Sequence, residues 1–279
     1  GLLMLCKTDK GLHEEAEVAE VAHAIGLEAK VLDATETAKL DPDITMNVAG
    51  SVHFPQDCHL DPSKFVRLLR QKVQELGGVI ESGVSIDTLE TSGGKLTAVS
   101  GNGRRFEGTK FVIAGGSWTA NLLKRVGLNL PLQAGKGYSL TLPHPPQLPR
   151  LCSIFAEAKV AITPMGPTLR FGGTMEVGGL DLTVNPARVH GIVKSVNAYF
   201  PEFSEASFKD VRPWAGLRPV SPDGVPYLGK VRGLENLIVN SGHAMIGLSL
   251  GPVSGRLAAD LLANDTPFRP IDAMAPGRF

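Results

Sequence analysis

Two glycine-rich blocks near the C-terminal end constrain the fold of this 279-residue chain most strongly. The first runs from Trp214 to Gly229 and carries Arg218 between leucine and proline. The second, 236–251, reads as a strand over 237–240, a glycine loop and the start of a helix. This order predicts a fixed positive charge beside a helix N-terminus, whose free N–H groups stabilise negative charge. A gap between the two suits a small anionic substrate that lies against an electron-poor cofactor.

The composition is that of an ordinary globular protein. With 43% hydrophobic residues and a net charge of zero, nothing favours nucleic acid or an anionic membrane surface as a partner. The longest apolar tract, 244–262, is interrupted by glycine, proline and charge, and it falls short of the roughly 20 apolar residues that a transmembrane helix needs. Cys6, Cys58 and Cys152 are scattered, which predicts reduced thiols in a reducing compartment. We therefore expect a cytoplasmic protein, with peripheral attachment to the inner membrane left open.

The hydrophobic pattern predicts a mixed α/β fold of two interleaved domains. Strand–helix units of the parallel type occupy 61–135 and 234–264, and antiparallel material occupies 1–60 and 136–233. Because parallel-type and antiparallel segments alternate along the chain, we expect each of two domains to be built from separate segments, with no single linker between the domains. The first pair of segments predicts a partial parallel-sheet domain, and the second pair predicts a domain built on an antiparallel sheet.

Capping residues and periodicity predict the individual elements. Asp61 caps a helix that Pro62 begins and Gly77 ends. A helix over 14–25 is expected to turn one face inward, made of Val18, Val21, Ala22 and Ile25. Three more helices are expected to begin at Ser117, Pro186 and about Ser249. Strands are expected at 2–7, 30–32, 50–54, 79–81, 84–90, 96–100, 105–107, 110–114, 138–142, 160–163, 168–172 and 237–240.

Two glycine turns follow predicted buried strands. Gly115 and Gly116 end the run that starts at Phe111, where they let a ligand approach the backbone, although an ordinary strand–helix turn has the same pattern. Gly242 and His243 precede the last helix, where the alternative is a tight turn with a surface histidine. Both turns are therefore candidates for cofactor binding.

Arg218 is the candidate for substrate binding. An arginine fork matches a carboxylate with two parallel hydrogen bonds, and the alternative is a structural ion pair with Asp223. The other polar residues of interest, for each of which a structural role is the alternative, are His59, Lys136, Tyr138, Glu176 and His243. No Ser–His–Asp, Cys–His or metal-ligand spacing occurs, so we expect no metal site.

Taken together, several segments resemble the D-amino-acid oxidase (DAO) type of FAD-dependent oxidoreductases, and among these the bacterial D-amino-acid dehydrogenases and glycine oxidases. The matching segments are Cys58–Pro62, Phe111–Trp118, Lys136–Leu140, Arg170–Glu176, Trp214–Gly229 and Asn236–Gly251. The resemblance implies an FAD-binding domain with a parallel sheet, here 61–135 plus 234–264. It also implies a substrate domain on an antiparallel sheet, here 1–60 plus 136–233.

The resemblance also implies roles for particular residues. Arg218 matches the arginine that holds the substrate carboxylate, and Val84 falls where backbone atoms bind the adenine end of FAD. Gly115, Gly116 and Trp118 match the turn beside the cofactor. The loop and helix start that face the flavin match Gly242, His243, Ile246, Gly247 and Leu248. Apart from the resemblance, the polar residues His59, Tyr138 and His243 complete the predicted catalytic set with Arg218.

The implied activity belongs to amino-acid catabolism. A D-amino acid is oxidised to an imino acid as the Cα hydrogen leaves as hydride for flavin N5. A glycine or sarcosine type of amine oxidase is the alternative, and the electron acceptor, oxygen or a carrier, stays open.

Family members begin with a strand, a G-x-G-x-x-G helix and a ribose-binding acidic residue, and this fingerprint is absent from these 279 residues. The pyrophosphate of FAD then lacks the helix N-terminus that would bind it. We therefore expect weak or absent FAD binding by this chain, and a truncated, non-catalytic remnant is a further alternative. An open sheet edge favours pairing with another chain, which predicts a homo-oligomer.

Overall fold

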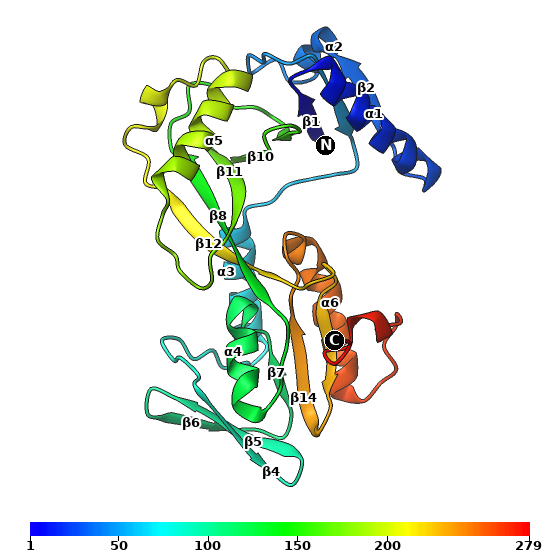
Figure 1. Cartoon of the computed structure of the whole chain (residues 1–279), viewed down its shortest axis with the longest axis vertical. Coiled ribbons are helices and arrows are strands. Elements are labelled where there is room, and N and C mark those ends of the chain that lie inside the picture. Colours follow the sequence, from blue (N-terminus) through cyan, green and yellow to red (C-terminus); the bar gives the residue numbers. More distant parts are fainter. The chain divides into compact units, whose positions relative to one another are not determined.

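The computed structural model describes all 279 residues and has a mixed α/β fold, as the sequence predicts (Figure 1). The chain forms two compact units. Unit 1 comprises 1–65, 137–175 and 183–216, and unit 2 comprises 66–136, 176–182 and 217–279. Residues 217–233 therefore lie in unit 2, whereas the predicted substrate domain includes them; which unit binds cofactor and which binds substrate stays a prediction.

The strands are β1 (Leu2–Cys6), β2 (Lys30–Asp33), β3 (Gly50–Phe54), β4 (Thr88–Ser92), β5 (Lys95–Gly101), β6 (Arg104–Glu107), β7 (Phe111–Ile113), β8 (Gln133–Leu142), β9 (Cys152–Phe155), β10 (Val160–Met165), β11 (Thr168–Val177), β12 (Trp214–Val220), β13 (Tyr227–Val231) and β14 (Leu234–Ser241). The α-helices are α1 (Asp9–Ala24), α2 (Ala34–Leu40), α3 (Pro62–Glu75), α4 (Thr119–Leu123), α5 (Pro186–Tyr199) and α6 (Gly247–Ala263). None of these helices combines the length and the apolar character that crossing a bilayer requires.

An eight-stranded sheet is the framework of unit 1. Its strand order is β12-β8-β11-β10-β9-β1-β3-β2. From β11 to β2 neighbouring strands are antiparallel except for β1 and β9, which run parallel. The sheet is thus mainly antiparallel, as predicted for 1–60 and 136–233, and its one parallel pair arises because β9, which the sequence pattern missed, lies between β1 and β10.

The main core of unit 1 lies between this sheet and α5 (Figure 1). Alternation along β11 places Leu169 and Phe171 in the core and turns Arg170 to the opposite face. Aromatic rings fill the centre: Phe155 stacks on Tyr199 at 4.0 Å between ring centroids. The helix predicted to begin at Pro186 is confirmed, and its residues Ile192, Val193 and Val196 are all buried.

The face predicted for the first helix is wrong except at Ala22. α1 starts earlier than predicted, with the Thr8 side chain accepting the Gly11 N–H at 3.0 Å. Val18, Val21 and Ile25 are exposed, and the buried positions are taken by alanine and glycine: Gly11, Ala19 and Ala22. Small residues let a helix approach a sheet closely, so packing distance, not hydrophobicity, determines which face of α1 lies against β1 and β3.

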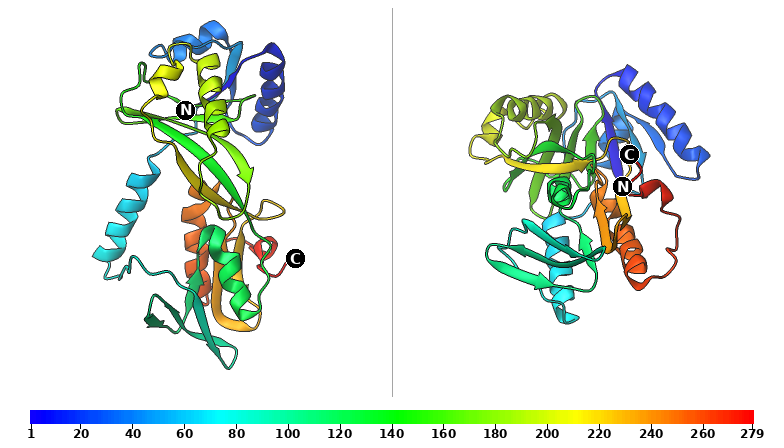
Figure 2. Two further views of the ribbon diagram at one scale, coloured as in Figure 1. Left: turned by 60° about the vertical axis from the view of Figure 1, so that its left-hand side comes forward. Right: turned by 60° about the horizontal axis from the view of Figure 1, so that its bottom comes forward.

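Unit 2 contains two three-stranded sheets. The first has the order β13-β14-β7, with β14 parallel to β7, and α6 packs beside β13 and β14. The second, β4-β5-β6, is the antiparallel ribbon drawn in teal in Figure 2. It contains the hairpin predicted around Gly101–Gly103. No strand forms at 79–81, and the strand predicted from Val84 starts only at Thr88.

Candidate functional site

The two predicted glycine turns, which follow β7 and β14, meet at the carboxyl ends of these parallel strands in unit 2. The carboxyl ends of parallel neighbours lie side by side, which is where open α/β sheets bind ligands. The Ser241 hydroxyl donates a hydrogen bond to the Gly116 carbonyl at 3.1 Å. The Thr119 hydroxyl in turn donates to the Ser241 oxygen at 3.1 Å. Ser241 thus fastens the turn after β7 to the loop after β14, a role that no sequence motif indicates.

The end of β12 is hydrogen-bonded to the loop that precedes α6. Val220 forms an antiparallel bridge with His243, and the Ala244 N–H donates to the Pro219 carbonyl at 2.8 Å. Ala244 adopts a left-handed backbone conformation, with φ of 48°, that alanine rarely takes. Arg218, immediately before Pro219, is thereby placed on a strand whose end is tied to the start of the last helix.

The N-terminus of α6 offers free donors. The helix begins at Gly247, two residues before the predicted cap at Ser249, and Ile246 provides no side-chain cap. The first helical hydrogen bond runs from the Leu250 N–H to the Ile246 carbonyl at 3.0 Å. The N–H groups of Gly247, Leu248 and Ser249 therefore have no acceptor within the helix. Together with the helix dipole they favour a negatively charged ligand group at this end.

His243, in the loop before α6, is held by a serine of that helix. Its Nε2 lies 2.8 Å from Ser254 Oγ, and Ser254 is buried. Burial lowers the pKa of His243, so the imidazole is neutral at pH 7 and adds no positive charge to the loop. Ser254 was not predicted, because a serine inside a helix carries no signal by itself.

A cavity of about 570 Å³ opens beside β7 in unit 2. Gly115 and Trp118, both predicted to bind cofactor, line it; Val84 does not, but its neighbour Ser85 does. Ser117 does not cap a helix as predicted; its Oγ is buried without a hydrogen-bond partner. The cavity is within the ordinary size range of small-molecule sites.

Two predicted catalytic residues lie in unit 1. Tyr138 is 1% exposed and belongs to the main core of that unit, which favours a structural role. His59 is exposed in the segment between β3 and α3. The structure therefore groups Gly115, Gly116, Trp118, Arg218, Gly242, His243, Ile246, Gly247 and Leu248 in one unit and leaves His59 and Tyr138 outside it.

Asp223, the alternative ion-pair partner for Arg218, is engaged by a different arginine. Its carboxylate forms a bidentate pair with Arg278, at 2.8 Å from Nη2 and 2.9 Å from Nε. Its Oδ1 also accepts the Val225 N–H at 3.1 Å. Asp223 thus anchors the last residues of the chain to the turn before β13.

This ion pair predicts an acid-dependent loss of stability. Hydrogen bonds from Arg278 lower the pKa of Asp223 from 3.8 to about 2. Because the folded-state pKa is the lower one, the stabilisation is complete above pH 4 and is lost as the pH falls toward 2. We expect Asp223→Asn to lower the melting temperature at pH 5 and to differ little from the parent protein near pH 2. A constant difference across this range would show that the carboxylate charge is not responsible.

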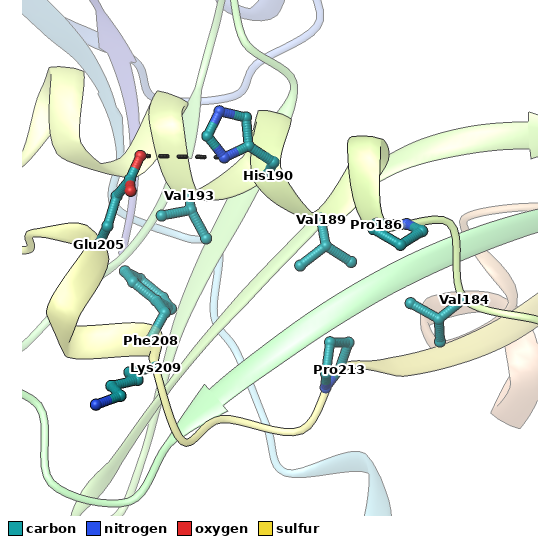
Figure 3. A pocket seen from close by; sticks show the side chains of 9 residues that line it. All are labelled: Val184, Pro186, Val189, His190, Val193, Glu205, Phe208, Lys209 and Pro213. Carbon is teal, nitrogen blue, oxygen red and sulfur yellow. Dashed lines mark ion pairs between the residues drawn. The ribbon is translucent and has the colours of Figure 1, made fainter.

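A second cavity, of about 340 Å³, lies in unit 1 between α5 and residues 205–213 (Figure 3). Val189, Val193 and Phe208 form its apolar lining. At its rim His190 Nδ1 lies 4.0 Å from Glu205 Oε1, drawn as a dashed line in Figure 3. None of the predicted site residues lines it.

Known proteins share both the sequence pattern and the fold. Residues 1–261 match the DAO family model, described as FAD dependent oxidoreductase. A D-amino acid dehydrogenase from Allorhizobium ampelinum is 34% identical over 270 residues, which cover 94% of this chain and 63% of that protein. This chain thus spans less than two thirds of that relative's length.

Two solved structures illustrate the similarity of fold. Glycine oxidase from Geobacillus kaustophilus superposes with a TM-score of 0.90 at 24% identity, covering 100% of this chain and 75% of that one. Glycine oxidase from Bacillus cereus superposes with a TM-score of 0.84 at 23% identity, covering 95% and 72%. At such identities the likeness shows the fold alone.

Proposed function

Because this chain belongs to the DAO family of FAD-dependent oxidoreductases, we propose that the protein oxidises D-amino acids with FAD as its cofactor. The 34% identity to a D-amino acid dehydrogenase supports this substrate class. The observation that carries the proposal is the junction of β12 with the loop before α6, where Ala244 N–H binds the Pro219 carbonyl. This hydrogen bond joins the strand that carries Arg218 to the loop before α6, whose N-terminus favours an anion.

The residues at the sheet edge in unit 2 fit a flavin nucleotide. Ser117 Oγ and Asn240 Oδ1 are buried there without hydrogen-bond partners, and a buried polar atom of this kind calls for one. The cavity beside Gly115 and Trp118 has the volume of an ordinary small-molecule site. FAD, when bound, supplies the electron-accepting flavin. The chain contributes free N–H donors at Gly247 and Leu248, which suit the electron-rich edge of a reduced flavin.

Each protein group has a defined task in this proposal. Arg218 binds the substrate carboxylate through two parallel hydrogen bonds and so fixes the orientation of Cα. The α6 N-terminus stabilises negative charge that develops next to it. Neutral His243 holds the loop in place through its hydrogen bond with Ser254. The positive potential at the site then comes from Arg218 and the N-terminus of α6. The site thus works by orientation and electrostatics and needs no strong acid–base pair.

An activity panel tests the proposal. The protein, with FAD added in excess because the G-x-G-x-x-G motif is absent, is given D-alanine, L-alanine, glycine and sarcosine with a dye acceptor, and peroxide is measured in parallel. We expect dye reduction with the D-amino acid and not with its L-enantiomer. Preference for glycine or sarcosine would replace the proposal by an amine oxidase, and no turnover with any of the four would contradict both.

A further inference from the structure

A partly buried arginine of unit 1 has no carboxylate within ion-pair distance. Arg170 lies near the start of β11, on the sheet face opposite the core that Leu169 and Phe171 enter. Its guanidinium donates a hydrogen bond from Nη2 to Ser139 Oγ at 2.9 Å, and Ser139 is itself buried. A guanidinium carries five N–H donors, and the hydrogen bond to Ser139 uses one of them.

The charge of Arg170 is poorly compensated. Burial lowers the pKa of Arg170, and the charge of Asp61 opposes this shift only in part. The Asp61 carboxylate serves another purpose, because its Oδ1 accepts the N–H groups of Ser63 at 2.9 Å and Lys64 at 3.1 Å as the cap of α3. A partly desolvated cation of this kind gains when an anion binds to it.

An exposed indole lies against the same guanidinium. The Arg170 Cζ atom is 5.3 Å from the centre of the Trp214 ring, within cation–π range. The ring lies across Gly216, where an added Cβ would come within 2.1 Å of its Cη2 atom. Gly216 therefore makes room for the ring. Trp214 remains 59% exposed and presents apolar surface beside the cation.

We propose that Arg170, Ser139 and Trp214 form a binding site for a small organic carboxylate whose apolar part packs on the indole. The planar fork of arginine fits a carboxylate through two hydrogen bonds, and the contact with the ring holds the fork in place before binding. Inorganic phosphate also fits the fork, but it has no apolar part for Trp214. The combination of charge and aromatic surface therefore selects a carboxylate with a hydrocarbon body, such as benzoate.

Binding at this site is measured separately from the proposed oxidation. Its three residues lie in unit 1, and Arg218 follows Trp214 by four residues on the same strand, β12. Binding can be measured without FAD and without turnover, so its failure and the failure of the proposed function are separate results.

The test uses the two tryptophans of the chain, Trp118 and Trp214. The protein is labelled with 5-fluorotryptophan, and benzoate, acetate and inorganic phosphate are titrated in turn while both ¹⁹F resonances are followed. We expect benzoate to shift the Trp214 resonance saturably and to leave Trp118 in place. Acetate and phosphate should bind about tenfold more weakly or not at all, because neither covers the indole.

Variants separate the site from a surface charge effect. Arg170→Gln should abolish the saturable shift, and Arg170→Lys, which keeps the charge but loses the fork, should weaken binding by about tenfold. Arg212→Gln removes an exposed charge two residues from Trp214 and should leave binding unchanged. If Arg170→Gln fails to fold, the benzoate titration is repeated with Ser139→Ala and Arg170→Lys, and weaker binding by both variants supports the site. A shift that persists in the Arg170 variants, or that both tryptophans share equally, would overturn the site.

Discussion

Replacing Arg218 with alanine in the FAD-loaded protein is expected to lower kcat/KM for a D-amino acid by about 30-fold or more. Loss of a bidentate contact to a buried carboxylate costs ~2–5 kcal/mol, and each 1.4 kcal/mol corresponds to about a factor of ten. Because the contact exists in the ground state too, much of the loss should appear in KM. Steady-state kinetics with the dye acceptor measures both parameters.

Two further variants make the Arg218 result specific. Arg218→Lys keeps a positive charge without the fork and should recover only part of the loss. Arg232→Ala removes an exposed arginine of the same unit and should leave the kinetics unchanged. If Arg218→Ala matched the parent protein in KM and kcat, another group would have to hold the substrate carboxylate.

Truncation of Phe155 to alanine is expected to cost ~3–5 kcal/mol of the free energy of unfolding. This ring is fully buried, stacks on Tyr199 with an interplanar angle of 13° and meets Phe200 edge-on at 5.0 Å between centroids. Removing it leaves a cavity among side chains that β9, β10 and α5 hold in place. Urea denaturation followed by far-ultraviolet circular dichroism measures the loss.

Phe268→Ala is the matched control for this core prediction. The same side chain is removed there from a position that is 51% exposed, so the expected change is under ~1 kcal/mol. Equal destabilisation by the two substitutions would show that the aromatic cluster around Phe155 is not the stabilising centre of unit 1.

Elements with explicit start and stop residues were predictable from the sequence. Asp61 caps α3 through the Ser63 and Lys64 N–H groups, as its position before Pro62 predicts. Gly77, the predicted end of α3, adopts the left-handed conformation, with φ of 84°. Such local signals involve only neighbouring residues, so they can be read without knowledge of the tertiary structure.

Features that depend on distant partners were not predictable. β9 has only four residues, and it pairs both with its neighbour β10 and with β1, about 150 positions away in the chain. The inward face of α1 followed the size of Ala19 and Ala22 instead of the hydrophobicity of Val18 and Val21. In both cases tertiary packing overrides the local pattern.

The candidate site was predictable in its glycines and its arginine but not in the contacts that join them. Gly116 and Gly242 stood out because a glycine that closely follows a buried strand indicates a turn, and both adopt positive φ angles, of 55° and 83°. The hydroxyl of Ser241 that binds the Gly116 carbonyl, and that of Ser254 at His243, carry no sequence signal. Serine is common on protein surfaces, and only the fold shows which of its hydroxyl groups connect two segments.

A crystal structure of the FAD-loaded protein with a bound D-amino acid analogue is the most direct test of the central claim. We expect two hydrogen bonds of about 2.7–2.9 Å from the Arg218 guanidinium to the ligand carboxylate. The flavin should lie against the N–H groups at the start of α6. A ligand carboxylate held away from Arg218, or a flavin remote from Gly247 and Leu248, would contradict the account.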